Sequence, residues 1–289
     1  MAADVKEQDI LKYWESGYWI SPPLLDRQTV ARIRQELNRI FTDERDSDNY
    51  TWFEFPKPEP GSGQLTQVTN AWWINDTIKE LVTHPAIGKM AAVLMKTPEV
   101  RLWHDQVLSK PGTASGNKVT DEGNVGWHQD YAHWQCSNNT NMCSIWLALQ
   151  DTDLNNGGMR TVVGSHKWGV SKEASTFYDR DLDKLKDRYV ANRPWVDEPC
   201  ILKAGQASFH HALTFHGSGP NHSPNPRLCV IIHVMSEDTG LRTDGKWHLC
   251  ATLLGPKAKT NDRFNGPFFP TLYSETNPEK IAQYGNNAT

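Results

Sequence analysis

The chain has 289 residues, of which 38% are hydrophobic and 22% are charged, and its formal net charge is −4. This composition is typical of a soluble globular protein, and no block of Lys or Arg indicates binding to nucleic acid or to a membrane surface. The sequence contains no apolar run of membrane-spanning length, no secretory signal and no C-x-x-C pair among its five cysteines. We therefore expect one cytoplasmic domain over residues 1–289, acting as a monomer or homodimer.

Residues 1–98 are predicted to form a mostly helical wrapping. Asp26 can cap a helix whose apolar residues follow the three-four spacing of one buried face. These apolar residues are Val30, Ile33, Leu37, Ile40 and Phe41. A second amphipathic stretch covers about residues 77–95, and His84-Pro85 is expected to divide it into two helices.

Residues 99–254 are predicted to form the core, because short apolar runs alternate there with Gly, Pro and Asn turns. The predicted strands are Arg101–Leu108, Cys143–Leu149, Arg160–Val163, Ala207–Phe215 and Leu228–Met235. This pattern favours a mainly β fold with flanking helices, either a sandwich or a jelly roll. The charged segment 171–193 is interpreted as a solvated helical insertion, with a lid over an active site as the alternative. Residues 255–289 are expected to form a C-terminal tail.

His128 and Asp130 are the most informative pair in the chain. Side chains two residues apart on a strand point to the same face, so this pair aims an imidazole and a carboxylate at one point. Two histidines and one carboxylate on one face of an octahedron are diagnostic of non-haem Fe(II) oxygenases, which keep the other positions open for a co-substrate and O2. Residues 206–216 offer His210, His211 and His216 as the third ligand.

His216 is the preferred third ligand because of the sequence that follows it. Residues 217–221 have turn chemistry, and an apolar strand begins at Arg227. A hairpin of this length would bring Arg227 beside His216. The guanidinium is suited to binding a carboxylate through two parallel hydrogen bonds, and the Ser218 hydroxyl can add a third. A metal beside an anchored carboxylate predicts a site for 2-oxoglutarate.

Several motifs match a known family in the same order. They are W-H-Q-D at 127–130, S-I-W-L-A-L at 144–149, N-N-G-G-M-R at 155–160, G-S-H-K at 164–167, and H-A-L-T-F-H-G-S-G-P-N at 211–221 followed by Arg227. From about residue 8 to 235, the chain resembles the phytanoyl-CoA dioxygenase family of Fe(II)/2-oxoglutarate oxygenases. The resemblance implies a double-stranded β-helix, which is a cupin-like jelly-roll core with flanking helices.

The resemblance also assigns roles to individual residues. It implies that His128, Asp130 and His216 bind Fe(II), and that Arg227 and Ser218 anchor the 2-oxoglutarate carboxylate. Lys110 and Trp146 match two further family positions that contact this co-substrate. His211 matches a family histidine that is not a ligand.

The expected activity is hydroxylation of a small metabolite or natural-product intermediate, with O2 as oxidant and release of succinate and CO2. Related halogenases replace the metal-binding carboxylate with a small residue, so the presence of Asp130 argues against halogenation. The alternatives are a non-catalytic sensor of metal or 2-oxoglutarate, a cupin-like metal enzyme that does not use 2-oxoglutarate, or an oxygenase of the same fold that performs desaturation, epoxidation or ring rearrangement.

Candidate substrate contacts border the His-x-Asp segment. Gln129, Tyr131, His133 and Trp134 could line the pocket, and Arg160 follows a Gly-Gly turn and could meet a substrate anion. The chain has 12 tryptophans, and an aromatic pocket wall would favour a cation or a flat ring. The alternative is that most of these tryptophans belong to the core.

Overall fold

The computed structural model describes residues 4–47, 53–54, 62–114, 119–171, 173–190, 193–279 and 281. Its α-helices are α1 (Glu7–Ser16), α2 (Arg27–Phe41), α3 (Asp76–Val82), α4 (Pro85–Met95), α5 (Leu182–Val190) and α6 (Leu249–Thr252). Its strands are β1 (Tyr18–Ile20), β2 (Phe53–Glu54), β3 (Thr66–Thr69), β4 (Glu99–Lys110), β5 (Val125–His128), β6 (Met142–Ala148), β7 (Met159–Val162), β8 (Asp197–Pro199), β9 (Ala207–His211), β10 (His216–Ser218), β11 (Arg227–Ser236) and β12 (Thr271–Ser274).

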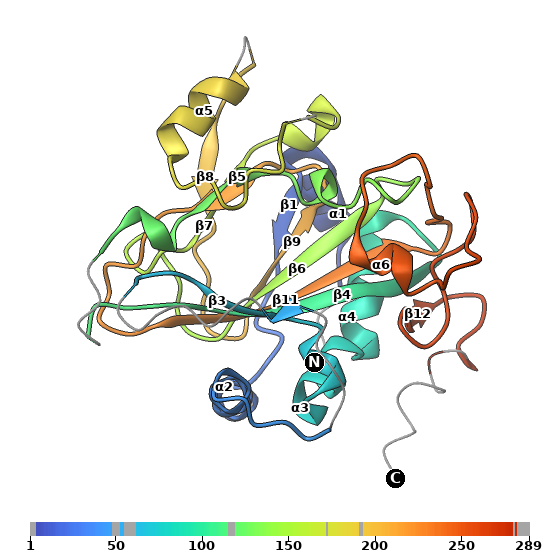
Figure 1. Cartoon of the computed structure of the whole chain (residues 1–289), viewed down its shortest axis with the longest axis horizontal. Coiled ribbons are helices and arrows are strands. Elements are labelled where there is room, and N and C mark those ends of the chain that lie inside the picture. Colours follow the sequence, from blue (N-terminus) through green and yellow to red (C-terminus); the bar gives the residue numbers. More distant parts are fainter. Residues whose placement is uncertain are drawn as a thin grey trace.

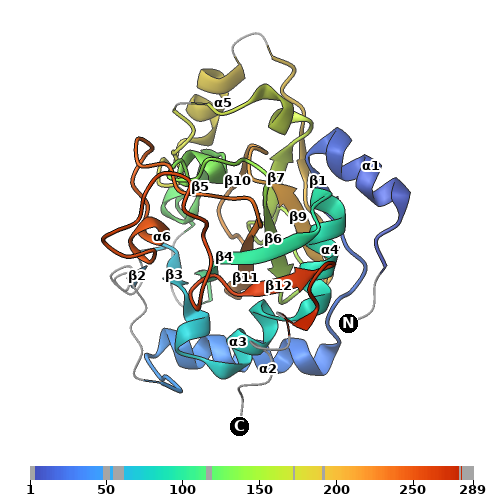
Figure 2. The same cartoon turned by 90° about the vertical axis from the view of Figure 1, so that its right-hand side faces the viewer.

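The strands form two antiparallel sheets (Figure 1). The larger sheet has the order β1-β9-β6-β11-β4-β3-β2, with β12 paired to β4, and the smaller sheet has the order β5-β10-β7-β8. The predicted helical wrapping therefore also supplies β1, β2 and β3 to the larger sheet, and the predicted tail supplies β12. Helices α2 and α3 lie beside the larger sheet, whereas α5 lies at the other end of the molecule (Figure 2).

Strand β11 shows how the larger sheet separates its two faces. Val230 and Ile232 belong to the main hydrophobic core, which the sheet shares with the N-terminal helices. Arg227 and His233 alternate with them and line the cavities between the two sheets. Because successive side chains of a strand point to opposite faces, one strand contributes both to the core and to the interior of the site.

The N-terminal helices form where the apolar spacing places them. The Asp26 carboxylate accepts a hydrogen bond from Thr29 N at 2.7 Å and caps α2, which confirms that prediction. The buried residues of α2 are Val30, Ile33, Leu37 and Ile40. His84 caps α4 and separates it from α3, as expected. Within the described residues, no helix is long and apolar enough to cross a membrane.

The run predicted as one strand over Ala207–Phe215 is a strand only as far as His211, and residues 212–215 form a turn that leads to the smaller sheet. Strand β9 ends at His211, and β10 begins at His216 after a turn. Strand β10 pairs with β5 and β7, whereas β11 pairs with β4 and β6. The predicted hairpin between His216 and Arg227 is therefore wrong, because the connecting segment crosses from one sheet to the other.

The charged insertion at 171–193 contains helix α5, as predicted, but this helix has a buried face. Leu185 is fully buried and Tyr189 is 6% exposed. Both pack in a cluster with Trp127 and Phe215 against the smaller sheet. The insertion thus belongs to the wall of the jelly roll near the His128 strand.

Candidate metal centre and its two cavities

His128, Asp130 and His216 come together between the sheets. Strand pairing sets His216 directly opposite His128, and Gln129 keeps an extended backbone that carries Asp130 to the same side. The Asp130 Oδ1 atom lies 3.4 Å from His128 Nε2 and 3.6 Å from His216 Nε2. All three side chains are buried, and their ligand atoms lie within 4.8 Å of one another.

Backbone carbonyls orient both imidazole rings. His128 Nδ1 lies 2.7 Å from Gly126 O, and His216 Nδ1 lies 3.0 Å from Thr214 O. A carbonyl oxygen accepts only, so each Nδ1 carries the proton and each Nε2 presents its lone pair to the centre. This arrangement of ligand atoms fits a divalent transition metal, because two imidazole nitrogens and one carboxylate converge on one point.

The Asp130 carboxylate is ionised despite its burial. Burial raises the pKa of this carboxyl, but the surrounding histidines, His216 foremost, hold the net pKa well below its usual range. Its Oδ2 atom accepts a hydrogen bond from Ser144 Oγ at 2.6 Å and lies 3.4 Å from His210 Nε2. The first carboxylate oxygen therefore faces the metal position while the second is held by the larger sheet.

A small cavity of about 50 Å³ lies on one side of this centre, and the buried cation Arg227 lines it. Lys110 and Arg227 are direct neighbours on β4 and β11, and they are 1% and 3% exposed. Among the described residues that line this cavity, Asp130 is the only acid. Lys110 contacts the cavity wall through Ser218 Oγ. Because like charges directly opposite on a sheet destabilise it, this pair is suited to an anion bound beside Arg227.

The hydrogen bonds that Lys110 and Arg227 form do not use all of their N–H donors. Lys110 Nζ donates to Ser218 Oγ at 2.7 Å and also to Gly219 O. Burial, followed by the nearby Arg227, lowers the Lys110 pKa well below its ordinary value. Arg227 Nε is buried and has no hydrogen-bond partner within the described part of the chain. The guanidinium carbon lies 5.0 Å from the Trp146 ring centroid, which makes a cation–π contact.

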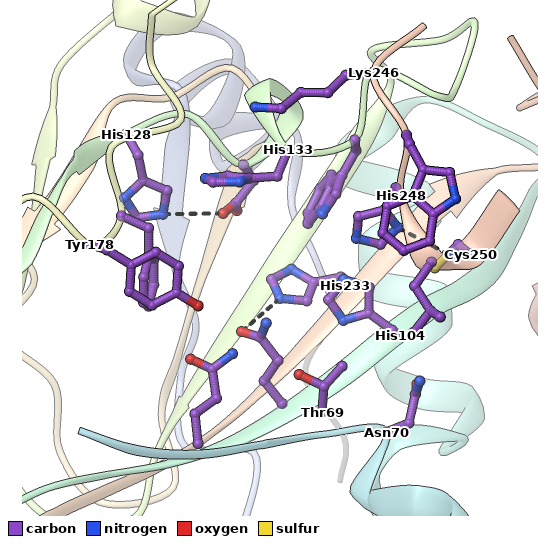
Figure 3. A pocket seen from close by; sticks show the side chains of 17 residues that line it. Thr69, Asn70, His104, His128, His133, Tyr178, His233, Lys246, His248 and Cys250 are labelled. Carbon is purple, nitrogen blue, oxygen red and sulfur yellow. Dashed lines mark hydrogen bonds and ion pairs between the residues drawn. The ribbon is translucent and has the colours of Figure 1, made fainter. Parts of the chain in front are cut away.

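A larger cavity of about 260 Å³ opens on the other side of the centre (Figure 3). Its polar lining is dominated by imidazoles and side-chain amides. Burial lowers the pKa of His104 and His248 to about 3 and that of His133 to about 4, so these rings are neutral at pH 7. Among the described lining residues, Asp130 is the only acid and Lys246 is the only Lys or Arg.

The comparison with known families gives a match over most of the chain. The profile described as Phytanoyl-CoA dioxygenase (PhyH) matches residues 13–229. The chain belongs to this family. It is therefore an Fe(II)/2-oxoglutarate-dependent dioxygenase that uses O2. The triad fits the iron ion, and the neighbouring Arg227 and Lys110 fit the dicarboxylate 2-oxoglutarate.

Curated members of the phytanoyl-CoA dioxygenase family show how far the likeness extends. A probable alpha-ketoglutarate-dependent hypophosphite dioxygenase of Stutzerimonas stutzeri is 26% identical over 78% of this chain and 77% of its own length. An ectoine dioxygenase of Streptomyces avermitilis is 25% identical over 78% and 76% of the two chains. These relatives act on very different molecules, so membership of the family does not identify a substrate.

A solved structure agrees with the jelly-roll fold. The non-heme alpha ketoglutarate dependent epimerase SnoN from nogalamycin biosynthesis superimposes with a TM-score of 0.69 and 24% identity, covering 92% of this chain and 98% of its own. SnoN has also been crystallised with Fe3+, alpha ketoglutarate and nogalamycin RO. The likeness confirms the cupin-like architecture expected for this member of the family.

Of the residues predicted to contact substrate, two line the larger cavity and three do not. His133 and Trp134 line the larger cavity. The Gln129 amide instead binds the backbone at Gly169, Leu213 and Ser171, which joins three loops.

Tyr131 and Arg160 also point elsewhere. Tyr131 OH donates to Ser137 O at 2.7 Å, and Arg160 forms an ion pair with Asp197 on the neighbouring strand. Neither side chain lines the larger cavity, so the structure does not bring them to the metal centre.

Sequence reasoning missed much of the cavity wall. His233, Gln106 and Phe177 line both cavities, and His104 and His248 line the larger one. One signal was available, because His233 lies six residues beyond Arg227 on the same strand and therefore on the same face. Phe177 comes from the insertion, and its ring lies 5.2 Å from that of His128.

Proposed function

We propose that this enzyme hydroxylates a small organic molecule, with His128, Asp130 and His216 holding Fe(II). The triad is buried and preorganised by backbone hydrogen bonds to both histidine rings. When bound, iron and 2-oxoglutarate supply the oxidising power, with O2 as oxidant and succinate and CO2 as products. The protein holds the ligands, binds the co-substrate and presents one C–H bond of the substrate to the centre.

Lys110 and Arg227 carry this proposal. They are two buried cations on neighbouring strands, and Asp130 is the only acid among the described residues that line the small cavity beside Arg227. Arg227 would bind the far carboxylate of 2-oxoglutarate, with Ser218 and Lys110 as further donors. Trp146 holds the guanidinium from one face. A dicarboxylate of this kind neutralises the pair and satisfies the free donors in one step.

The larger cavity is proposed as the substrate site. At about 260 Å³ it is slightly smaller than the ordinary range for ligand sites, so it suits a small metabolite. No acid other than Asp130 lines its described wall, so a cationic substrate would find no counter-charge there. The neutral imidazoles and amides favour an uncharged or anionic molecule that forms several hydrogen bonds.

The decisive experiment measures succinate formation from 2-oxoglutarate by the purified enzyme, with and without Fe(II), during a screen of small metabolites by mass spectrometry. A product heavier than its substrate by one oxygen atom would support hydroxylation. A product lighter by two hydrogens would identify desaturation instead. Succinate formation that is independent of Fe(II) would overturn the proposal.

Asp130→Ala is the matched test of the metal ligand. It removes the only carboxylate of the triad, so we expect Fe(II)-dependent succinate formation to fall to background while the circular dichroism spectrum stays unchanged. Asp76→Ala is the control, because Asp76 is an exposed acid in the first turn of α3. Wild-type turnover by Asp130→Ala would exclude Asp130 as a ligand.

A further inference from the structure

His233 lies where the two cavities meet, although it does not belong to the triad. Its side chain projects from the inner face of β11 and is 3% exposed. The ring centroid lies 4.5 Å from that of His104 and 4.8 Å from that of Trp134. Figure 3 shows His233 and His104 side by side on the cavity wall, facing the space beside His128. The ring is thus in position to touch a substrate near the metal.

Ser144 connects this ring to the metal ligand. Its hydroxyl lies 2.6 Å from Asp130 Oδ2 and 2.7 Å from His233 Nδ1. A serine hydroxyl has one proton, and an ionised carboxylate can only accept. Hydrogen bonds to a charged acceptor are roughly twice as strong as neutral ones, so the serine proton goes to Asp130. Ser144 Oγ must then accept the N–H of His233 Nδ1.

The second ring nitrogen of His233 is consequently an acceptor. Burial, followed by the neighbouring His104, lowers the pKa of His233 well below its ordinary value, so the ring has a single proton. This proton occupies Nδ1, and Nε2 presents a lone pair. The Gln106 Oε1 atom lies 3.5 Å from Nε2, at the limit of a hydrogen bond, and a half-turn of that amide exchanges this oxygen for the NH2 group, which can donate to Nε2. A better donor can therefore displace Gln106.

We propose that Ser144 and His233 form a relay that orients Asp130 and selects a substrate bearing a hydroxyl or N–H group beside the oxidised C–H bond. That group donates to His233 Nε2. This assignment rests on the proposed function, since it places the substrate in the larger cavity. His233 acts as a specificity-determining residue, and Ser144 acts as a positioning residue for the metal ligand.

Two further side chains indicate the class of substrate. Both nitrogens of His104 and the amide nitrogen of Asn70 are buried and have no partner among the described residues. Both residues line the larger cavity and are 4% and 2% exposed. Buried polar groups are normally hydrogen-bonded, so a ligand that satisfies them is favoured. The wall matches a small molecule with several hydroxyl groups and no cationic group.

The tautomer of His233 tests the relay without turnover. Nitrogen-15 NMR of histidine-labelled enzyme, loaded with diamagnetic Zn(II) in place of Fe(II), distinguishes protonated from bare ring nitrogens. The His233→Asn variant identifies the resonances of this ring. We expect Nδ1 to be protonated and Nε2 to be bare. A proton on Nε2 would overturn the proposal, whatever the reaction of the enzyme.

Metal affinity tests the link between Ser144 and Asp130. Ser144→Ala should weaken Fe(II) binding by about 10-fold or more, because loss of a hydrogen bond to a ligating group has effects of this size. His233→Asn should bind Fe(II) as wild type does, since the Asn amide can still donate to Ser144. Ser274→Ala removes a buried serine of β12 and serves as the control. Unchanged affinity in Ser144→Ala would refute the positioning role.

The substrate found in the turnover screen tests specificity. Its analogue lacking the donor group should lose kcat/KM by about 10- to 100-fold with the wild-type enzyme, which corresponds to one buried hydrogen bond. With His233→Leu, the substrate and the analogue should react with similar kcat/KM. An equal loss in both enzymes would show that the donor binds elsewhere. Such a result would leave the hydroxylase function intact while removing the proposed role of His233.

Discussion

The two cavities that meet at the triad differ in how they present charge. The smaller cavity is lined by the cation Arg227, and Lys110 on the neighbouring strand contacts its wall through Ser218. The larger cavity is lined by neutral imidazoles and amides, with one lysine, Lys246, that is exposed. The first arrangement suits one fixed anion, whereas the second can suit different molecules after small changes of side chain.

This difference indicates how one fold can serve many substrates. The anion site depends on β4 and β11, whose residues also belong to the main hydrophobic core, so its geometry is tied to the stability of the protein. Much of the larger wall comes from other segments, including Tyr178 of the insertion and residues 246–250 near α6. Substrate choice can therefore change without disturbing the co-substrate site.

The largest effect is expected from removing the cation that lines the smaller cavity. Arg227→Leu removes the guanidinium and should raise the Kd for 2-oxoglutarate on the order of 100-fold, the usual cost of losing one partner of a buried charge pair. Isothermal titration calorimetry on the anaerobic Fe(II) enzyme measures this Kd. Arg32→Leu is the control, because Arg32 is an exposed arginine of α2. Equal affinity in Arg227→Leu would place the co-substrate elsewhere.

The pH dependence of 2-oxoglutarate binding tests whether Lys110 also contributes a positive charge to the co-substrate site. Burial and then Arg227 lower the Lys110 pKa in the free enzyme, while a bound dianion favours the charged amine. Above the lowered pKa, binding therefore takes up a proton, and the affinity should fall by up to about 10-fold per pH unit as pH rises. Calorimetry in buffers of different ionisation enthalpy detects this proton. Lys110→Met should abolish the uptake.

The neutral histidines of the larger cavity should make the free energy of unfolding sensitive to acid. Burial lowers the pKa of His104 and His248, which line the larger cavity, to about 3 each, below the usual value of about 6.5. Between these values the unfolded chain binds more protons than the folded one, so stability falls as pH falls. Each ring contributes up to about 1.4 kcal/mol per pH unit.

Urea unfolding of the metal-free protein at several pH values from 7 to 4 measures this slope. His248→Gln should reduce the slope by about one histidine, and the exposed His222→Gln is its matched control. An unchanged slope in His248→Gln would mean that this ring takes up its proton in the folded protein as well.

The smallest effect concerns the aromatic face that holds Arg227. Trp146→Leu keeps an apolar side chain but removes the cation–π contact, which contributes about 0.5–2 kcal/mol. The Kd for 2-oxoglutarate should rise about 2- to 30-fold, well below the effect of Arg227→Leu. An increase as large as that of Arg227→Leu would show that Trp146 contacts the co-substrate itself.

The residues of the candidate metal centre could be found from the sequence because they obey a local rule. His128 ends β5 and the extended Gln129 joins it to Asp130, so the spacing of two residues brings both side chains to one side. Arg227 was found through an expected hairpin, yet it reaches the site from the opposite sheet. The arginine is in the predicted neighbourhood because the jelly roll is closed, and local turn chemistry could not reveal that.

The wall of the larger cavity depends on contacts that no local pattern contains. His104 and His233 face each other because β4 and β11 pair in one register. His248 lies in a segment without strand periodicity, and Phe177 lies in a charged insertion. In contrast, the core helices follow from three-four spacing and a capping aspartate, which are both local. Tertiary pairing therefore decides the substrate side of the site.

The crowding of imidazoles around Asp130 has a consequence for the identity of the metal. His210 Nε2 lies 3.4 Å from Asp130 Oδ2, so a fourth nitrogen lies just behind the three ligand groups. Sites rich in imidazole bind Cu(II), Ni(II) and Zn(II) more tightly than Fe(II), following the Irving–Williams order. Supply and cellular metal handling, rather than affinity, must therefore give this enzyme its iron. Protein purified in air should regain turnover only after chelation and anaerobic reloading.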